Sequence, residues 1–206
     1  MTKQVQNAYR DEWEYFKAKI RRPTAICAAV FLAVALLYYA VSIQDIAVAK
    51  EAYNQISQLF EEKGFFEQTS SLGLFWMIFT NNAMAGFFVL VTGVMPFVFA
   101  PIWAVVSNAA LAGVVIAVSQ DSGAGLGEIM GSLLPHGIFE LPAFFFTAGL
   151  GLSICHIATK KIFGRGAGLS FWKEFWRAWQ SFVFVALPLF LLAAFVEAFI
   201  TIAFVK

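Results

Sequence analysis

The chain has 206 residues, of which 60% are hydrophobic and 13% are charged, and its formal net charge is +1. Soluble domains carry roughly 25% charged residues, so this composition excludes a water-soluble globule of this size. The small net charge argues against a nucleic-acid binder, which needs a basic face. The length suits one membrane domain that covers residues 1–206.

A membrane-spanning helix needs roughly 20 mostly apolar residues, and five stretches of the chain meet that requirement. In chain order they are residues 24–43 and, with approximate ends, 72–91, 95–118, 133–158 and 182–205. A short turn around Gly93 and Pro96 separates the second stretch from the third, which predicts a helical hairpin. We therefore expect an all-α fold, a polytopic membrane protein of about five transmembrane helices with additional amphipathic interfacial helices.

Three further segments show helical spacing of apolar residues and are expected to lie outside the bilayer core. They are a cytoplasmic amphipathic helix within 1–23, an external segment at 44–70 and an interfacial helix in the cytoplasmic linker 159–181. The last combines aromatic and basic residues, as helices at a membrane interface do. The first two suit solvated connectors packed on the bundle equally well. The glycine-rich stretch 121–131 is expected to be a flexible external loop.

The distribution of Lys and Arg residues gives an orientation under the positive-inside rule. Six of them precede the first span and five lie between the fourth and fifth spans. The other segments hold two, none and one, in chain order. This pattern predicts a cytoplasmic N-terminus and an external C-terminus.

Six amide or ionisable residues fall within the predicted spans, where such side chains are costly and warrant a functional hypothesis. They are Asn81, Asn82, Asn108, His136, Glu140 and Glu197. With a rise of ~1.5 Å per residue, all six lie in the outer half of the membrane and close to one level. This convergence predicts a polar cluster or a water-accessible pocket that opens outward.

Three interpretations of this cluster stay open. His136 and Glu140 are four residues apart and share a helix face, so they can hold a divalent metal such as zinc, with Glu197 as a third ligand. The cluster could equally lock the bundle through hydrogen bonds, or pass a proton or a solute. Pro142 frees the carbonyl of Ile138, which predicts a kink or a break in the fourth span beside Glu140.

Small residues recur at every fourth position in two spans, a spacing that lets helices approach closely in lipid. The stripes are Ala100, Ala104, Asn108 and Ala112 in the third span, and Ala143, Thr147, Gly151 and Cys155 in the fourth. We expect them to serve packing within one chain more than dimerisation. A homodimer is still among the expected assemblies, because small helical bundles often pair.

The segment from Leu134 to Ala143 resembles the hallmark of the stage II sporulation protein M family. The Asn81-Asn82 pair matches that family's asparagine pair in span two. Asn108 resembles the asparagine of its asparagine–glycine motif in span three, although Ala109 follows here and the glycine comes at Gly113. The resemblance covers nearly the whole chain. The motif residues that carry over are Asn81, Asn82, Asn108, His136, Glu140 and Pro142.

This resemblance implies a bacterial cytoplasmic membrane protein. In spore-forming bacteria the family's named member belongs to an engulfment machine, in which it anchors and recruits two partner proteins that degrade peptidoglycan. By that likeness we expect a non-enzymatic membrane scaffold that recruits cell-wall-remodelling partners, with residues 44–70 as the partner surface. The alternative is a small transporter or channel that uses the polar cluster.

The sequence contains no pattern that points to an intramembrane enzyme. An intramembrane protease would need a Ser–His pair, two membrane aspartates or a His-Glu-x-x-His zinc motif. No aspartate lies within any of the five apolar stretches. Ser107 and His136 form a candidate pair, but the polar cluster already accounts for both, so no enzymatic activity is expected.

Overall fold

The protein is described here by a computed structural model of residues 3–62 and 70–201. Within these ranges the side chains of seven residues are left out of the description: Gln4, Val5, Phe60, Ser132, Pro135, His136 and Thr201. Every regular element of the described chain is a helix, which confirms the predicted all-α class.

The helices follow one another with short connections. They are α1 (Lys3–Tyr15), η1 (Phe16–Ile20), α2 (Arg21–Ser42), α3 (Ile46–Glu62), α4 (Ser71–Thr92), α5 (Ala100–Asp121), α6 (Leu126–Ile162), α7 (Phe171–Ser181), η2 (Phe182–Ala186), α8 (Leu187–Phe195) and η3 (Val196–Thr201). Among the described residues, five helical segments are long and apolar enough to cross a membrane. They are Gln6–Ser42, Ser71–Thr92, Ala100–Asp121, Gly137–Ile162 and Phe171–Ile200, in agreement with the predicted number of spans.

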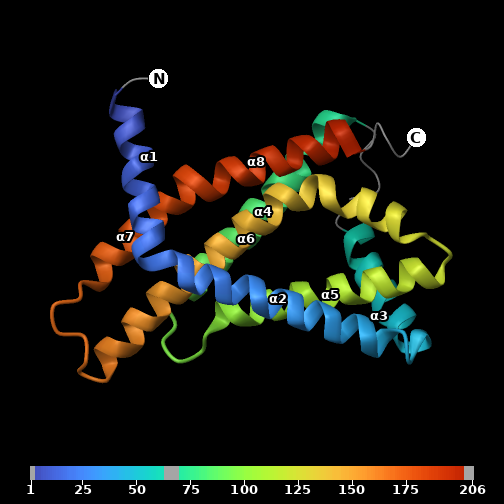
Figure 1. Ribbon diagram of the computed structural model, residues 1–206, viewed down its shortest axis with the longest axis horizontal. Helices are drawn as coiled ribbons and strands as arrows, with labels where there is room; N and C mark the ends of the chain where they lie inside the picture. The colour runs from blue at the N-terminus through green and yellow to red at the C-terminus, as the bar shows by residue number, and fades with distance from the viewer. Residues whose placement is uncertain (1–2, 63–69, 202–206) are drawn as a thin grey trace.

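The first and last spans are longer than a bilayer requires. A crossing takes roughly 20 residues, whereas these two helical segments have 37 and 30. Each joins a predicted interfacial helix to a predicted span without a loop, through the π-helical turns η1 and η2. Such turns insert an extra residue into the helical ladder and often occur at functional sites. Figure 1 shows that the chain bends at the first of them, so that α1 turns away from α2 toward α7.

Close backbone contact joins α2 to α5, the most extensively packed pair of helices in the described bundle. A Cβ atom placed on Gly113 of α5 would lie 2.8 Å from the backbone nitrogen of Tyr39 in α2, so only glycine permits this approach. The contact between α4 and α5 is far smaller. The turn at residues 93–99 therefore connects two neighbouring spans, while the principal partner of α5 is α2 and not its predicted hairpin mate.

The long helix α6 passes through Pro142 without interruption, so the fourth span is not broken. Figure 1 shows that it changes direction between its yellow and its orange part. It also begins earlier than expected and takes in most of the stretch predicted to be a flexible loop. The carboxylate of Glu128 accepts a hydrogen bond from the Gly125 backbone N–H at 3.0 Å, and this cap starts the helix inside the glycine-rich segment.

The two predicted stripes of small residues differ in how far they are buried. Ala143, Thr147 and Cys155 of α6 have no exposed surface, which confirms that this stripe packs within the chain. In α5, by contrast, Asn108 is exposed. The packed face of α5 is offset by one residue from the predicted stripe and contains Pro101, Val105, Ala109, Gly113 and Ala117.

Residues 46–62 of the predicted external segment form α3, which lies against the end of α5. Ala49 is 4% exposed and packs with Val114 and Val118. An ion pair of 2.6 Å joins Lys50 to Asp121. Residues 63–69 of that segment lie outside the described residues.

Candidate functional site

Four of the six predicted polar residues line one cavity of about 420 Å³. Asn81 and Asn82 come from α4, Asn108 from α5 and Glu140 from α6. The remaining wall is apolar and includes residues of α2 and α8. It consists of Phe31, Ala85, Leu111, Ala112, Val115, Leu133, Leu141, Phe144 and Phe190. We call this space the polar cavity.

Helical periodicity explains why these side chains share one space. The lining positions of α5 are 108, 111, 112 and 115, and those of α6 are 133, 140, 141 and 144. Positions separated by three, four, seven, eight or eleven residues fall on one face of an α-helix. Each helix thus presents one mixed stripe, with its polar residue toward the cavity.

The three amides leave part of their hydrogen-bonding capacity unused. Asn108 donates to the carbonyl of Ala104 at 2.9 Å, and Asn81 donates to Asn82 at 3.5 Å. Among the described residues no hydrogen bond reaches the amide oxygen of Asn108. Buried or membrane-embedded amides are costly unless their remaining groups are satisfied, so the polar cavity is suited to water or a polar ligand.

The structure does not gather all six predicted residues at the polar cavity. Glu197 is half-buried in η3, seven positions after Phe190, and is not among the described lining residues. His136 lies one helical turn before Glu140 in α6, and its side chain is outside the described set. The side chains that the structure describes contain no group of three His, Cys, Asp or Glu that could hold a metal. Metal binding through His136, Glu140 and Glu197 stays a prediction.

Close helix packing lies between the polar cavity and the end of the bundle that carries α1 and α7. A Cβ atom on Gly151 of α6 would lie 2.8 Å from the Val89 carbonyl oxygen of α4 and from Cγ of Pro101 in α5. Gly93 meets the backbone of Gly151 at the same crossing. The backbones of α4 and α6 are therefore in close contact here, the Pro101 ring of α5 packs against the same point, and fully buried side chains such as Leu150 fill the surroundings.

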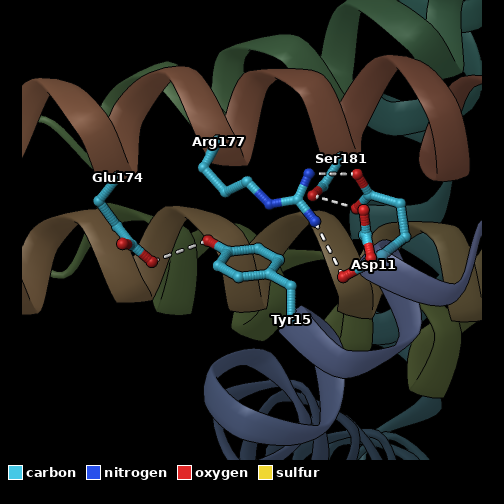
Figure 2. A network of polar contacts seen from close by, with 6 residues as sticks. Asp11, Tyr15, Glu174, Arg177 and Ser181 are labelled. Atoms are coloured by element: carbon cyan, nitrogen blue, oxygen red, sulfur yellow. Dashed lines mark hydrogen bonds and ion pairs between the residues drawn. The ribbon is translucent and has the colours of Figure 1, made fainter. Parts of the chain in front are cut away.

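A second polar feature joins α1 to α7, and Figure 2 shows its arrangement. Arg177 of α7 forms an ion pair with Glu12 and donates to the Asp11 carbonyl at 3.1 Å. Ser181 donates to the other oxygen of Glu12 at 2.6 Å. The Arg177 guanidinium also lies 4.7 Å from the centre of the Tyr15 ring.

The same network continues to Glu174, which is buried. This carboxylate accepts hydrogen bonds from the Tyr15 hydroxyl at 2.9 Å and from Lys19 at 2.6 Å. We define the α1–α7 network as the residues Asp11, Glu12, Tyr15, Lys19, Glu174, Arg177 and Ser181. Lys19 and Arg177 entered the count of basic residues that predicts the orientation, whereas Asp11, Glu12 and Glu174 were not singled out in the sequence. The spacing of the network residues contains a further signal, because 12, 15 and 19 share one helix face, as do 174, 177 and 181.

Comparison with known proteins adds one finding to this geometry. A family model described as stage II sporulation protein M matches residues 26–202, which include all six predicted polar residues. Neither the curated proteins nor the solved structures contain a match to the chain. The matched range includes α7 but not α1, so one half of the α1–α7 network lies outside it. The chain, a multi-pass membrane protein, belongs to the stage II sporulation protein M family, as its span-four motif predicted.

Proposed function

We propose that this protein is a non-enzymatic scaffold of the bacterial cytoplasmic membrane that recruits cell-wall-remodelling partners on the outer side. The polar cavity is its internal binding site. Membership of the stage II sporulation protein M family supports this proposal. The scaffold role itself is the one that the resemblance implies, an anchor for peptidoglycan-degrading partners. In this proposal α1 and α7 face the cytoplasm, and α3 and the C-terminus lie outside.

One observation favours a closed-ended binding site over a transport path. The crossing of α4, α5 and α6 at Gly93 and Gly151 leaves no room even for a methyl group between helices. A channel or transporter would need a route from the polar cavity past this crossing. The small-transporter alternative predicts uptake or leak in liposomes that contain the purified protein, whereas the scaffold proposal predicts flux equal to that of protein-free liposomes.

The exposed face of α3 is the proposed partner surface. Val48, Glu51 and Gln55 recur at helical spacing and are exposed, while Ala49 on the other face packs against α5. A photo-crosslinking residue placed at Gln55 should capture peptidoglycan-degrading proteins in cell envelopes. The matched control is Leu36, which is 68% exposed in the middle of α2 and should capture only lipid. Equal protein capture from both positions, or none from Gln55, would contradict the proposed surface.

The metal prediction has a test of its own. We would measure metal content and melting temperature of the detergent-purified protein beside the variants His136→Ala, Glu140→Gln and Glu197→Gln. Near-stoichiometric zinc, with a melting temperature that falls on chelation, would establish a metal-stabilised site. A metal-free protein whose variants merely melt earlier would make the polar cavity a hydrogen-bonded lock.

A further inference from the structure

The turn that joins α4 to α5 is apolar throughout, whereas turns are usually rich in glycine and short polar residues. Its five large side chains are each at least 37% exposed, namely Val94, Met95, Phe97, Val98 and Phe99. The end of α6 adds Ile162 and Phe163, which are 59% and 65% exposed. We define the apolar tip as residues 94–99 together with Ile162 and Phe163. Contiguous apolar surface of this kind indicates an interaction site.

The apolar tip is fixed to α6 by specific contacts. The Phe97 backbone N–H donates to Oγ1 of Thr159 at 3.2 Å, and the Cys155 thiol donates to the Met95 carbonyl at 3.3 Å. The rings of Phe97 and Phe163 meet edge to face, with their centres 5.3 Å apart. The exposed side chains of the turn therefore belong to a defined structure that combines two parts of the chain.

The backbone of this turn adopts an unfavourable conformation. Phe97 and Phe99 have φ angles of 68° and 48°, in the left-handed region that bulky side chains rarely adopt. Such residues persist only where the surrounding structure holds them, and they cluster at functional sites. The fold thus presents these two rings on its surface at a cost in backbone conformation.

The lengths of the neighbouring spans place the apolar tip relative to the bilayer. The helices α4 and α5 have 22 residues each. At a rise of ~1.5 Å per residue each helix is about 33 Å long, which matches a hydrocarbon core of ~30 Å. The turn between them therefore lies just beyond the hydrocarbon, level with the lipid headgroups. Apolar side chains at this level bury in the boundary between headgroups and acyl chains.

Three exposed cations accompany the apolar tip. Lys160 and Lys161 lie in the last turn of α6, and Arg165 follows Phe163 by two residues. None of the three forms an ion pair with a described residue. The sequence has no Asp or Glu in 68–120 or in 141–173, the two stretches that contain the apolar tip. The positive charge beside the tip therefore lacks a carboxylate from its own surroundings.

We propose that the apolar tip inserts among anionic phospholipids of the leaflet at this end of the bundle, with phosphatidylglycerol as the probe. Its apolar side chains lie at the base of the headgroups, and Lys160, Lys161 and Arg165 bind the lipid phosphates. In the proposed orientation this leaflet is the cytoplasmic one. The position of the tip at headgroup level is the reason to choose lipid over a soluble partner protein, and the unpaired cations are the reason to choose an anionic headgroup.

The first test measures whether the turn contacts lipid. Val98→Cys is labelled with the fluorophore NBD in a chain that carries Cys27→Ala and Cys155→Ser, where the serine hydroxyl keeps a donor toward the Met95 carbonyl. In nanodiscs, a phospholipid with a spin label near its headgroup should quench this fluorescence about as strongly as at Leu72→Cys, which is 60% exposed at the other end of α4. Absence of quenching by the lipid, with full quenching by aqueous iodide, would overturn the proposal and leave the tip free for a soluble partner.

The second test identifies the headgroup. Nanodiscs with equal amounts of phosphatidylglycerol and phosphatidylcholine carry the spin label on one lipid or on the other. The label at position 98 should be quenched about twofold more by phosphatidylglycerol, whereas the label at Leu72→Cys should show no preference. The triple variant Lys160→Gln, Lys161→Gln, Arg165→Gln should lose the preference at position 98 and keep its contact with lipid. A preference that survives in the triple variant, or equal quenching by both lipids without these substitutions, would overturn the choice of an anionic lipid.

Discussion

Arg177 shows at the scale of single residues how polar groups connect parts of this chain that lie far apart in sequence. It binds α1 through an ion pair, a hydrogen bond and contact with the Tyr15 ring. The side chains of Arg177 and Glu12 are only 27% and 11% exposed. Removing one partner of a charge pair so well shielded costs more than removing one partner of a surface pair, because the other charge is left without compensation.

We predict that Arg177→Met lowers the free energy of unfolding by about 2 kcal/mol, since it leaves the Glu12 carboxylate without its cation. Unfolding by SDS in mixed micelles would measure the change. The matched control is Glu14→Gln, which breaks the exposed pair with Lys17 and should change stability by less than about 0.5 kcal/mol. Equal effects of the two substitutions would contradict the importance of the α1–α7 network.

Two glycines of α6 should respond in opposite ways to the same substitution. Gly151→Ala places a methyl group against Val89 and Pro101 and should destabilise the protein by about 1–3 kcal/mol. Gly127→Ala meets nothing within 4 Å and should stabilise it by about 0.5–1 kcal/mol, because alanine loses less entropy in a helix. The melting temperatures of both variants, measured in the same detergent, test these two expectations. A tolerated alanine at position 151 would mean that the helix crossing is looser than described.

The sequence predicted part of this residue-scale picture. Asn81, Asn82, Asn108 and Glu140 were singled out by their cost within apolar spans, and they line one cavity. The stripe predicted for α5 is one residue away from the face that actually packs. Small residues occur on both faces of this helix, so their spacing alone does not identify the face that approaches a neighbouring helix.

At the scale of elements, the spans were predictable because a long apolar run identifies a membrane helix in any context. The start of α6 was not predicted, because glycines are typical of loops. The hydrogen bond between the Glu128 carboxylate and the Gly125 backbone N–H stabilises a helix start within this glycine-rich segment. The junctions of α1 with α2 and of α7 with α8 were also missed. A π-helical turn continues a helix across a change from polar to apolar composition, and that change looks like a boundary in the sequence.

The helix α3 is held mainly by a small cluster around Ala49 and by the pair between Lys50 and Asp121. We predict that Ala49→Asp detaches α3, because it places a charge against Val114 and Val118. Amide hydrogen exchange followed by mass spectrometry should then speed up in residues 46–62 and stay unchanged in α5. Lys50→Met, the milder control, should raise the α3 rates only slightly. Faster exchange throughout α5 would show that the two helices unfold together.

At the scale of the whole molecule, two of the spaces between the described helices differ in their chemistry. The polar cavity, of about 420 Å³, is lined by Asn81, Asn82, Asn108 and Glu140, and a larger apolar cavity of about 640 Å³ is bounded on one side by α1. Close packing at Gly93 and Gly151 lies between the polar cavity and the α1–α7 end. The sequence predicted a polar cluster or pocket from the polar residues of its spans, but it did not predict the apolar cavity, because such a cavity depends on how the helices cross and not on the pattern within any one of them.

We propose that the polar cavity opens toward the outer side of the membrane and is closed at its cytoplasmic end. The most direct test is the modification of Asn108→Cys by a membrane-impermeant thiol reagent, in a background where the buried Cys27 and Cys155 are alanine. Thiols react as thiolates and so need contact with water, and Leu36→Cys on a lipid-facing surface should stay unlabelled. We predict labelling from the outer side of oriented vesicles and none from the cytoplasmic side. Labelling from the cytoplasmic side, or from both sides, would show that the polar cavity is not closed toward the cytoplasm.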